Sequence, residues 1–265
     1  MSERSLRYLA RKINRAYEKE SFECFLVVGE MGRGKTSFAL HLAREVLGNW
    51  DVVLNYLFFD VTQALQVMYN SLINGRRLKI IILDDFGLWG SSLDWFESDK
   101  RAFVRFYNVI RECVSSVVIT SPLPQDILKR IREKSMYKVQ VDFDPECKDY
   151  SIARIYREKY DVGTNMFYRK MIAIIRYPRH YPDEVYKQYK IMRRSATILA
   201  LQNVMNLVHS TSSLEVLIWK MHNAGLSIRK IAGILNMDRN AVWRRLKKMR
   251  KRHEMMKLKT SIETL

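Results

Sequence analysis

The segment GEMGRGKTS, residues 29–37, constrains the fold more than any other part of the chain. It follows the apolar run FLVV and has the spacing Gly-x-x-x-x-Gly-Lys-Thr, which is the Walker A pattern of phosphate-binding loops. Glycines let backbone N–H groups turn toward an anion, and a helix that begins at the loop points its positive end at the same anion. Such a loop needs a buried strand before it and a helix after it, which predicts an α/β fold.

Apolar runs alternate with amphipathic segments over the first part of the chain. Short apolar runs of the kind that form buried strands lie at 22–28, 52–59, 79–83, 114–120 and 136–143. Helical patterns between them lie at 35–47, 62–73, 99–113 and 125–134. Strands that alternate with helices predict a mostly parallel sheet, here that of a P-loop NTPase of the AAA+/ASCE-like type.

The remaining sequence departs from this alternation. A hairpin rich in Tyr, Ile and Arg is predicted at 150–176; we expect it to extend the sheet, with contact to DNA or to a neighbouring subunit as the open alternative. The polar stretch HSTSS at 209–213 is the best linker candidate. The expected division is an N-terminal helix at 1–20, a P-loop ATPase domain at 21–195, a linker helix and linker at 196–213, a small all-α helix-turn-helix domain at 214–253 and a polar tail at 254–265.

The chain is strongly basic, with a formal net charge of +18 over 265 residues. Residues 161–265 carry 21 Lys+Arg against 7 Asp+Glu, whereas residues 1–160 carry 25 against 21. A chain with this balance binds a polyanion or lies on an acidic membrane surface. No apolar run approaches the roughly 18 residues that span a bilayer, and the three scattered cysteines fit a reducing compartment. We therefore expect a cytoplasmic protein that does not contact a membrane.

The Walker A loop predicts ATP and Mg²⁺ as cofactors. Lys35 is expected to reach the β- and γ-phosphates and the Thr36 hydroxyl to bind Mg²⁺. Gly32 gives the loop the form Gly-x-x-Gly-x-Gly-Lys-Thr, which is common among AAA+ and related ATPases. The residues expected to bind the nucleotide are Gly29, Glu30, Met31, Gly32, Arg33, Gly34, Lys35, Thr36 and Ser37.

Polar residues at the ends of two later strands predict the hydrolytic partners of the loop. Asp84 follows the run IIIL and is expected to hold Mg²⁺, while Asp85 is the candidate that orients or deprotonates the attacking water; a role as a turn cap is its alternative. Thr120 ends the next strand as a candidate sensor of the γ-phosphate, or as part of an ordinary turn. Arg130 and Arg132 are candidates for an arginine that enters a neighbouring subunit's site, with a solvated helix face as the alternative.

Residues 214–253 have the period and the capping residues of a helix-turn-helix. Ser227 is expected to cap one short helix and Asp238 the next. The residues predicted to pack between the helices are Ile231, Ala232, Leu235, Val242, Leu246 and Met249.

The outward face of the second helix is the predicted DNA contact. The stretch 214–253 carries 11 Lys+Arg against two acidic residues, which favours double-stranded DNA over a solvated basic hairpin or a protein-docking surface. A recognition helix reads base edges with its N-terminal part and contacts phosphates further along. The predicted DNA-binding residues are Arg239, Asn240, Trp243, Arg244, Lys247, Lys248 and Lys251.

The segments YLFFDVTQALQVM, IIILDDFGLWG, VVITSPLPQDILKRIREK and PDEVYKQYKIMRR resemble the predicted DnaA-like AAA+ ATPases of Sulfolobus fuselloviruses and plasmids. The resemblance covers about residues 20–195. It implies a thermophilic archaeal host and a role in replicating or maintaining a mobile element. It also implies Lys35 and Thr36 as Walker A, Asp84 and Asp85 as Walker B, and Thr120 as sensor. A helical AAA+ lid is not evident, because the hairpin occupies its place.

These features together predict an ATP-hydrolysing, DNA-binding protein that forms a homo-oligomer and assembles on duplex DNA. Two other functions stay open. The first is a DNA-binding regulator or partition adaptor that uses ATP only as a switch. The second is a DNA translocase of the packaging type.

Overall fold

The computed structural model describes residues 5–86, 106–107, 109–127 and 129–249. The chain divides into two compact units, Met1–Ala196 and Thr197–Leu265. Each unit has its own core and is described by itself. Within the described parts of the chain, no helix combines the length and the apolarity that are needed to cross a membrane.

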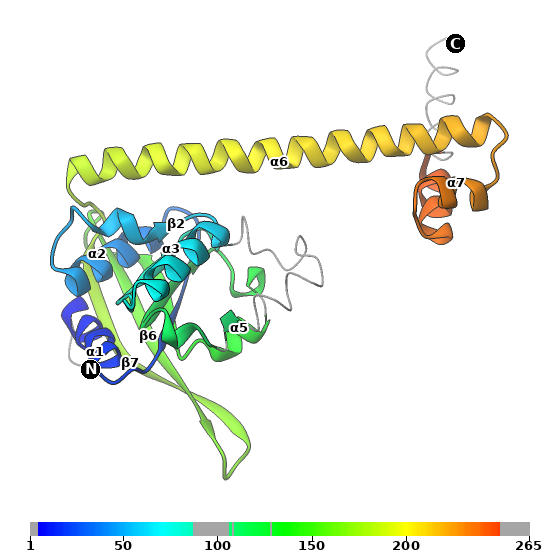
Figure 1. Cartoon of the computed structure of the whole chain (residues 1–265). Coiled ribbons are helices and arrows are strands. Elements are labelled where there is room, and N and C mark those ends of the chain that lie inside the picture. The colour runs from blue at the N-terminus through cyan, green and yellow to red at the C-terminus, as the bar shows by residue number, and fades with distance from the viewer. Residues whose placement is uncertain (1–4, 87–105, 108, 128, 250–265) are drawn as a thin grey trace. The chain divides into compact units, whose positions relative to one another are not determined.

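The first unit, drawn in Figure 1 with its N-terminal helix α1 in blue, is built on a seven-stranded sheet. The strand order is β2-β3-β4-β1-β5-β6-β7. The first five strands in this order pair in parallel, and β6 and β7 are added antiparallel at the β5 edge. The predicted mostly parallel sheet is therefore confirmed. The strands are β1 Glu23–Val28, β2 Leu57–Phe58, β3 Ile81–Leu83, β4 Ser116–Ser121, β5 Tyr137–Phe143, β6 Tyr150–Asp161 and β7 Met166–Pro178.

Helices cover both faces of this sheet, each with its own apolar core. On one face α1 (Leu6–Glu18) and α2 (Lys35–Leu47) bury their apolar sides against β1, β5, β6 and β7. On the other face α3 (Val61–Ile73) and α5 (Lys129–Lys134) pack against β1, β3 and β4. Two helical layers around a central sheet leave the carboxyl ends of the parallel strands open as a site for ligands.

Two predicted elements differ from the structure. Residues 52–59 form a 3-10 helix at Val53–Tyr56, whose Val53 and Leu54 are buried in the same core as α2, followed by the two-residue strand β2. In place of the helix expected at 125–134, a 3-10 turn lies at Pro124–Asp126, where the Asp126 carboxylate accepts the backbone N–H of Leu123 at 3.2 Å, and α5 begins at Lys129. Most of the helix expected at 99–113 lies outside the described residues.

Helix α6 runs without a break from Asp183 to Asn223. It therefore includes residues 209–213, where a linker was expected, and continues from the first unit into the second. The physical reason is that these 41 residues contain neither glycine nor proline, so the short run of Ser, Thr and His meets no residue that ends a helix.

The second unit continues from α6 through α7 (Ile228–Ile234) to a further helix described over 239–249. Its core contains apolar side chains from all three helices. The buried members are Ile218, Ile231, Ala232, Val242 and Leu246. Of the residues that were predicted to pack here, four are buried, namely Ile231, Ala232, Val242 and Leu246. The other two, Leu235 and Met249, are half-buried.

Candidate functional site

The glycines of the Walker A loop are required by the strands beside it. Gly29 comes directly after β1, and a Cβ there would lie 2.4 Å from the carbonyl oxygen of Val141 on β5. Gly34 has φ of 98°, and a Cβ there would lie 2.8 Å from the Ser151 hydroxyl on β6. Side chains at either position would collide with the sheet, so the loop keeps its backbone N–H groups uncovered only because both residues are glycine.

Lys35 begins α2 and lies across the loop. Its Nζ donates to the carbonyl oxygens of Gly29 and Glu30, each at 2.9 Å, and the residue is buried. Burial lowers the pKa of Lys35, and the carboxylates of Asp85 and Asp84 oppose that shift. The ammonium therefore sits among backbone dipoles and carboxylates, at the place where the negative charge of a phosphate would be neutralised.

Asp84 is the centre of a buried hydroxyl network at the end of β3. The Thr36 hydroxyl donates to its two carboxylate oxygens at 3.0 and 3.1 Å, and the Thr120 hydroxyl donates to Oδ1 at 2.6 Å. Asp84 is 1% exposed. Burial, and next the charge of Asp85, raise the pKa of Asp84, while the two threonine hydroxyls lower it. The structure thus brings together three predicted residues from β3, β4 and α2.

Asp85 lies at the mouth of the same site in an unusual conformation. Its φ of 48° is in the left-handed region, which non-glycine residues rarely adopt. Its backbone N–H donates to the Thr120 hydroxyl at 2.9 Å. Its carboxylate, 18% exposed, forms an ion pair with Arg193 in which Nη2 and Oδ2 are 2.8 Å apart. A non-glycine residue that the surrounding structure keeps in this strained conformation is typical of functional sites.

Residues that the sequence analysis did not identify complete the site. The Tyr189 hydroxyl donates to Asp84 Oδ2 at 3.2 Å, and Arg193 follows one helical turn later on α6. Arg179 donates from Nη2 to the carbonyl of Gly32 at 2.8 Å. The only available signal was the four-residue spacing of Tyr189 and Arg193, because nothing local indicates that α6 passes over the ends of β3 and β4.

Several of these residues line a cavity of about 920 Å³. Its walls include the Walker A loop, Asp85 and Arg193, and three tyrosines of the segment that leads into α6 and of α6 itself, Tyr181, Tyr186 and Tyr189. The volume is within the usual range for small-molecule sites. An ammonium and loop N–H groups suit phosphates, and a hydroxyl with two carboxylates suits Mg²⁺. The residues present therefore fit a magnesium nucleotide.

Arg130 and Arg132 lie on α5, away from this arrangement. Arg130 is exposed, and Arg132 donates from Nη1 to the carbonyl of Pro124 at 3.2 Å. Neither is among the described residues that line the cavity. A role in a neighbouring subunit's site stays a prediction for both.

In the second unit, two side-chain caps define the helix-turn-helix. The Ser227 hydroxyl accepts the backbone N–H of Lys230 at 3.3 Å and begins α7. The Asp238 carboxylate accepts the N–H groups of Asn240 and Ala241 at 2.9 and 3.1 Å and begins the helix at 239–249. Both caps agree with the sequence prediction, because Ser and Asp are among the strongest N-cap residues.

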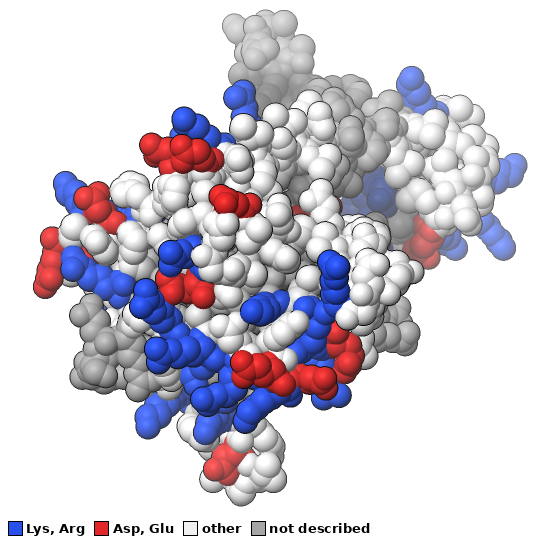
Figure 2. Space-filling view, turned by 60° about the vertical axis from the view of Figure 1, so that its left-hand side comes forward, with Lys and Arg blue, Asp and Glu red and all other residues white. Residues whose placement is uncertain are grey.

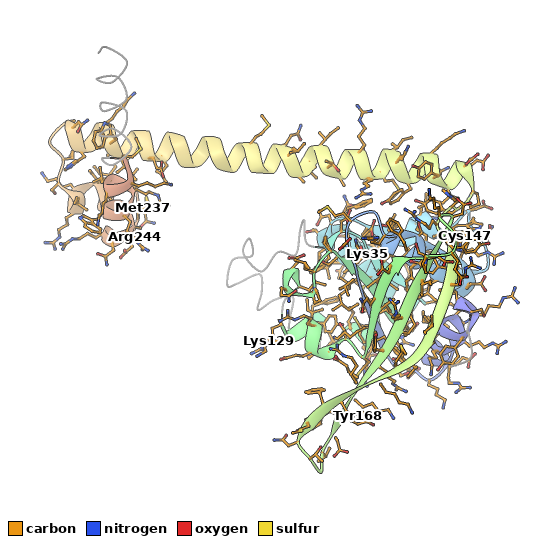
Figure 3. All side chains as sticks on the ribbon, turned by 180° about the vertical axis from the view of Figure 1, so that it is seen from behind. Lys35, Lys129, Cys147, Tyr168, Met237 and Arg244 are labelled. Atoms are coloured by element: carbon orange, nitrogen blue, oxygen red, sulfur yellow. The ribbon has the colours of Figure 1, made fainter. Side chains whose placement is uncertain are left out.

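The outward face of the helix at 239–249 carries most of the predicted DNA contacts. Six of them are exposed, namely Arg239, Asn240, Trp243, Arg244, Lys247 and Lys248 (Figure 3 labels Arg244). Lys248 also forms an ion pair, in which its Nζ lies 3.1 Å from the carboxylate of Glu215 on α6, a residue that is 3% exposed. Lys251 lies outside the described residues.

A comparison with known protein families supports the helix-turn-helix of the second unit. Residues 214–253 match the family described as winged helix-turn-helix DNA-binding. The match covers the stretch in which the sequence predicts this motif.

The N-terminal domain of zonular occludens toxin from Neisseria meningitidis is a distant structural likeness, with 10% identity, a TM-score of 0.36, and coverage of 63% of this chain and 98% of that one. That likeness is too weak to bear on function.

Two viral proteins are similar to most of the chain. Uncharacterized protein ORF286 of Acidianus two-tailed virus is 28% identical over 228 residues, which cover 75% of this chain and 78% of that protein. Uncharacterized protein B-251 of Sulfolobus spindle-shape virus 1 is 32% identical over 221 residues, which cover 78% of this chain and 88% of that protein. The expected resemblance to proteins of Sulfolobus viruses is confirmed, while the DnaA-like assignment stays a prediction. The chain belongs to the family of the viral protein B-251.

Proposed function

We propose that this protein is a DNA-binding P-loop ATPase, of the AAA+/ASCE-like type, of an archaeal virus or plasmid. The observation that supports it most is the hydrogen-bonded group of Thr36, Asp84 and Thr120, which come from three separate segments. Thr36 and Lys35 of the loop also line the cavity. A Walker A loop alone predicts only phosphate binding. A buried carboxylate that already accepts the Thr36 hydroxyl supplies the oxygen ligands that a hydrolytic magnesium site needs.

The proposed chemistry divides between the two aspartates. When bound, Mg²⁺ would neutralise charge on the phosphates. Thr36 and Asp84 would hold the ion, Lys35 would stabilise the charge that develops on the phosphates, and Thr120 keeps Asp84 oriented. Asp85 accepts the proton of the attacking water, or orients that water, since its carboxylate lies at the cavity.

The ion pair between Asp85 and Arg193 limits this chemistry in the structure as it stands. The guanidinium occupies Asp85 Oδ2, an oxygen that would otherwise accept a proton or a hydrogen bond from the attacking water. Release of Arg193 would free this oxygen. Phosphate oxygens of a bound nucleotide offer the guanidinium an alternative partner, since Arg193 lines the same cavity.

The helix-turn-helix is the proposed duplex-binding part. Its exposed side chains Arg239, Asn240, Trp243 and Arg244 occupy the first two turns after the Asp238 cap, where a recognition helix reads base edges. Helix α6 carries Tyr189 and Arg193 at the nucleotide site and continues to Asn223 in the second unit. This covalent continuity supports coupling between nucleotide state and DNA binding.

We place this activity in replication initiation or maintenance of the mobile element, in the cytoplasm of an archaeal host cell. ATP would favour a homo-oligomer on duplex DNA, with hydrolysis at subunit interfaces, where Arg132 or Arg130 would enter the neighbouring site. The viral relatives support the setting. The use of ATP as a switch by a regulator or partition adaptor is the second candidate, and the Arg193 pair supports it because Asp85 is engaged. A packaging translocase is the third.

Phosphate release tests the enzymatic part. Wild-type protein with Mg²⁺, ATP and duplex DNA should turn over ATP, and the Lys35→Ala variant should not. Turnover that is equal in the two proteins would refute the assignment. An Asp85→Asn variant separates fuel from switch: it should stay bound to ATP and DNA if hydrolysis drives release, and should behave like wild type if ATP is only a switch. Processive tracking along duplex DNA would instead indicate a translocase.

A further inference from the structure

The hairpin of β6 and β7 extends beyond the rest of the sheet. Strand β5 pairs with β6 only over Ser151–Arg157, whereas β6 and β7 pair with each other as far as Asp161 and Met166. Figures 1 and 3 show this end protruding, with Tyr168 labelled on it. We call residues 158–169 the free ribbon. A two-stranded ribbon without a second layer is marginally stable by itself, so a binding role is the first explanation to consider.

Large apolar side chains of the free ribbon are exposed to solvent. The exposed fractions are 85% for Val162, 66% for Met166, 61% for Phe167, 48% for Tyr160 and 47% for Tyr168. Monomeric proteins rarely expose so many neighbouring apolar groups unless the surface binds a partner. The aromatic members also have flat rings, which suit stacking.

The strand register sorts the free ribbon, together with the pair Arg157 and Lys170 at its base, into two faces. The cross-strand pairs are Arg157 with Lys170, Lys159 with Tyr168, Glu158 with Arg169, and Tyr160 with Phe167. Because side chains alternate along a strand, the first two pairs share one face and the last two share the other. The face with Arg157, Lys159, Tyr168 and Lys170 is called the basic face, and the opposite face is called the neutral face.

The two faces differ in charge. On the neutral face, Glu158 forms an ion pair with Arg169, and the rings of Tyr160 and Phe167 lie 5.0 Å apart. The basic face carries Arg157, Lys159 and Lys170 around Tyr168. Its one carboxylate, Asp161, is turned into the hairpin and accepts the backbone N–H of Thr164 at 3.0 Å.

The basic face continues toward α1. Arg157 lies over the ring of Tyr137, at 5.6 Å from its centroid, and Tyr137 belongs to the core that α1 covers. Burial raises the pKa of Glu23 on β1, and the charges of Arg157 and of Lys12 on α1 oppose that shift. Figure 2 shows Lys and Arg gathered just above the protruding end of the molecule at the bottom of the view.

The first unit is also more basic than residues 1–160 alone suggest. Residues 161–196, which belong to it, carry 8 Lys+Arg against 3 Asp+Glu. Half of the net charge of +18 therefore lies outside the helix-turn-helix unit. This excess lies outside the unit that is proposed to read duplex DNA.

We propose that the free ribbon binds single-stranded DNA. The cations Arg157, Lys159 and Lys170 contact phosphates, and bases stack on the exposed ring of Tyr168. Unpaired bases can leave their own stack and use such a ring, whereas the bases of a duplex are stacked on each other. A second copy of the chain is a poorer partner, because it would bring like charges together. The proposal is independent of the proposed ATPase activity.

Fluorescence anisotropy of a labelled 20-nucleotide oligo(dT), with the full chain and without nucleotide, tests this proposal. The Tyr168→Ala variant should bind the oligonucleotide roughly five- to a hundredfold more weakly, as is typical for the loss of one stacked base. Tyr168→Phe keeps the ring and should bind like wild type. The control is Tyr69→Ala on α3, where the side chain is 59% exposed, and it should also bind like wild type.

Two further measurements separate the alternatives. The double variant Lys159→Ala/Lys170→Ala should reduce the slope of log affinity against log salt by about 1.4, since each phosphate contact on single-stranded DNA contributes about 0.7. Affinity for a labelled 20-base-pair duplex should stay within about twofold of wild type for all variants, because the helix-turn-helix is unchanged. An unchanged oligo(dT) affinity in Tyr168→Ala, or an equal loss on duplex, overturns the proposal. Loss of self-association in sedimentation with intact oligo(dT) binding would assign the ribbon to a second copy instead.

Discussion

Replacement of Arg193 by alanine should weaken binding of a nucleoside triphosphate and leave the stability of the fold nearly unchanged. Arg193 is 53% exposed and its partner Asp85 is 18% exposed. A surface ion pair of this kind contributes about 0–1 kcal/mol to stability. We therefore expect the Arg193→Ala variant to unfold at nearly the same urea concentration as wild type.

The effect on nucleotide binding should be larger. If the guanidinium moves from Asp85 to the γ-phosphate, its removal deletes a charge-assisted hydrogen bond worth about 1.5–3 kcal/mol. That corresponds to roughly a ten- to hundredfold weaker binding of ATP, since 1.4 kcal/mol is a factor of ten. ADP lacks the γ-phosphate, so its affinity should change by less than about threefold by the same arithmetic.

Competition titrations against a fluorescent nucleotide, with Mg²⁺ present, give both affinities. Arg194→Ala is the matched control, because Arg194 is the exposed neighbour and is not among the described residues that line the cavity. The reasoning is refuted if Arg193→Ala binds ATP as tightly as wild type. An equal loss for ATP and ADP would show that Arg193 supports the site without reading the γ-phosphate.

Three further substitutions test other parts of the account. Burial raises the pKa of Asp84 above 3.8, so Asp84 takes up a proton more readily in the native protein than in the unfolded chain. Stability therefore falls as pH rises through that raised pKa. Asp84→Asn should raise the urea midpoint at pH 7 and abolish magnesium-dependent turnover. Gly29→Ala should destabilise by about 2–4 kcal/mol, because its Cβ meets a backbone carbonyl at 2.4 Å. Gly32→Ala, whose Cβ would meet no atom of the described residues within 4 Å, should cost about 1 kcal/mol for its positive φ, and urea unfolding compares the two. Arg244→Ala should weaken specific duplex binding by about 1–3 kcal/mol and non-specific binding less, as measured by anisotropy on two sequences; equal loss on both would make Arg244 a phosphate contact.

Those parts of the two sites whose structure depends on residues nearby in the sequence could be predicted from the sequence. The Walker A loop needs only a strand before Gly29 and a helix at Lys35, and both are visible as apolar runs and periodicity. Asp84 was predictable because it ends an apolar strand. The caps at Ser227 and Asp238 satisfy the first N–H groups of their own helices, so their roles are also local.

Contacts between distant segments were not predictable in this way. Tyr189 meets Asp84 across 105 positions and Arg193 meets Asp85 across 108. No period or spacing encodes such a pairing, because it depends on where α6 crosses the sheet. The helical conformation of residues 209–213 was missed for a related reason. Ser and Thr favour turns, but without glycine or proline the neighbouring helical residues decide the conformation.

The central claim is that one chain joins a nucleotide site to a DNA-binding helical unit and that the first controls the second. Sedimentation of the full chain on a labelled duplex, with Mg²⁺ and with or without a non-hydrolysable ATP analogue, tests it directly. The account predicts larger DNA-bound particles and a tighter complex with the analogue, and no such change in the Lys35→Ala variant. Identical particle size and duplex affinity with and without the analogue would contradict it.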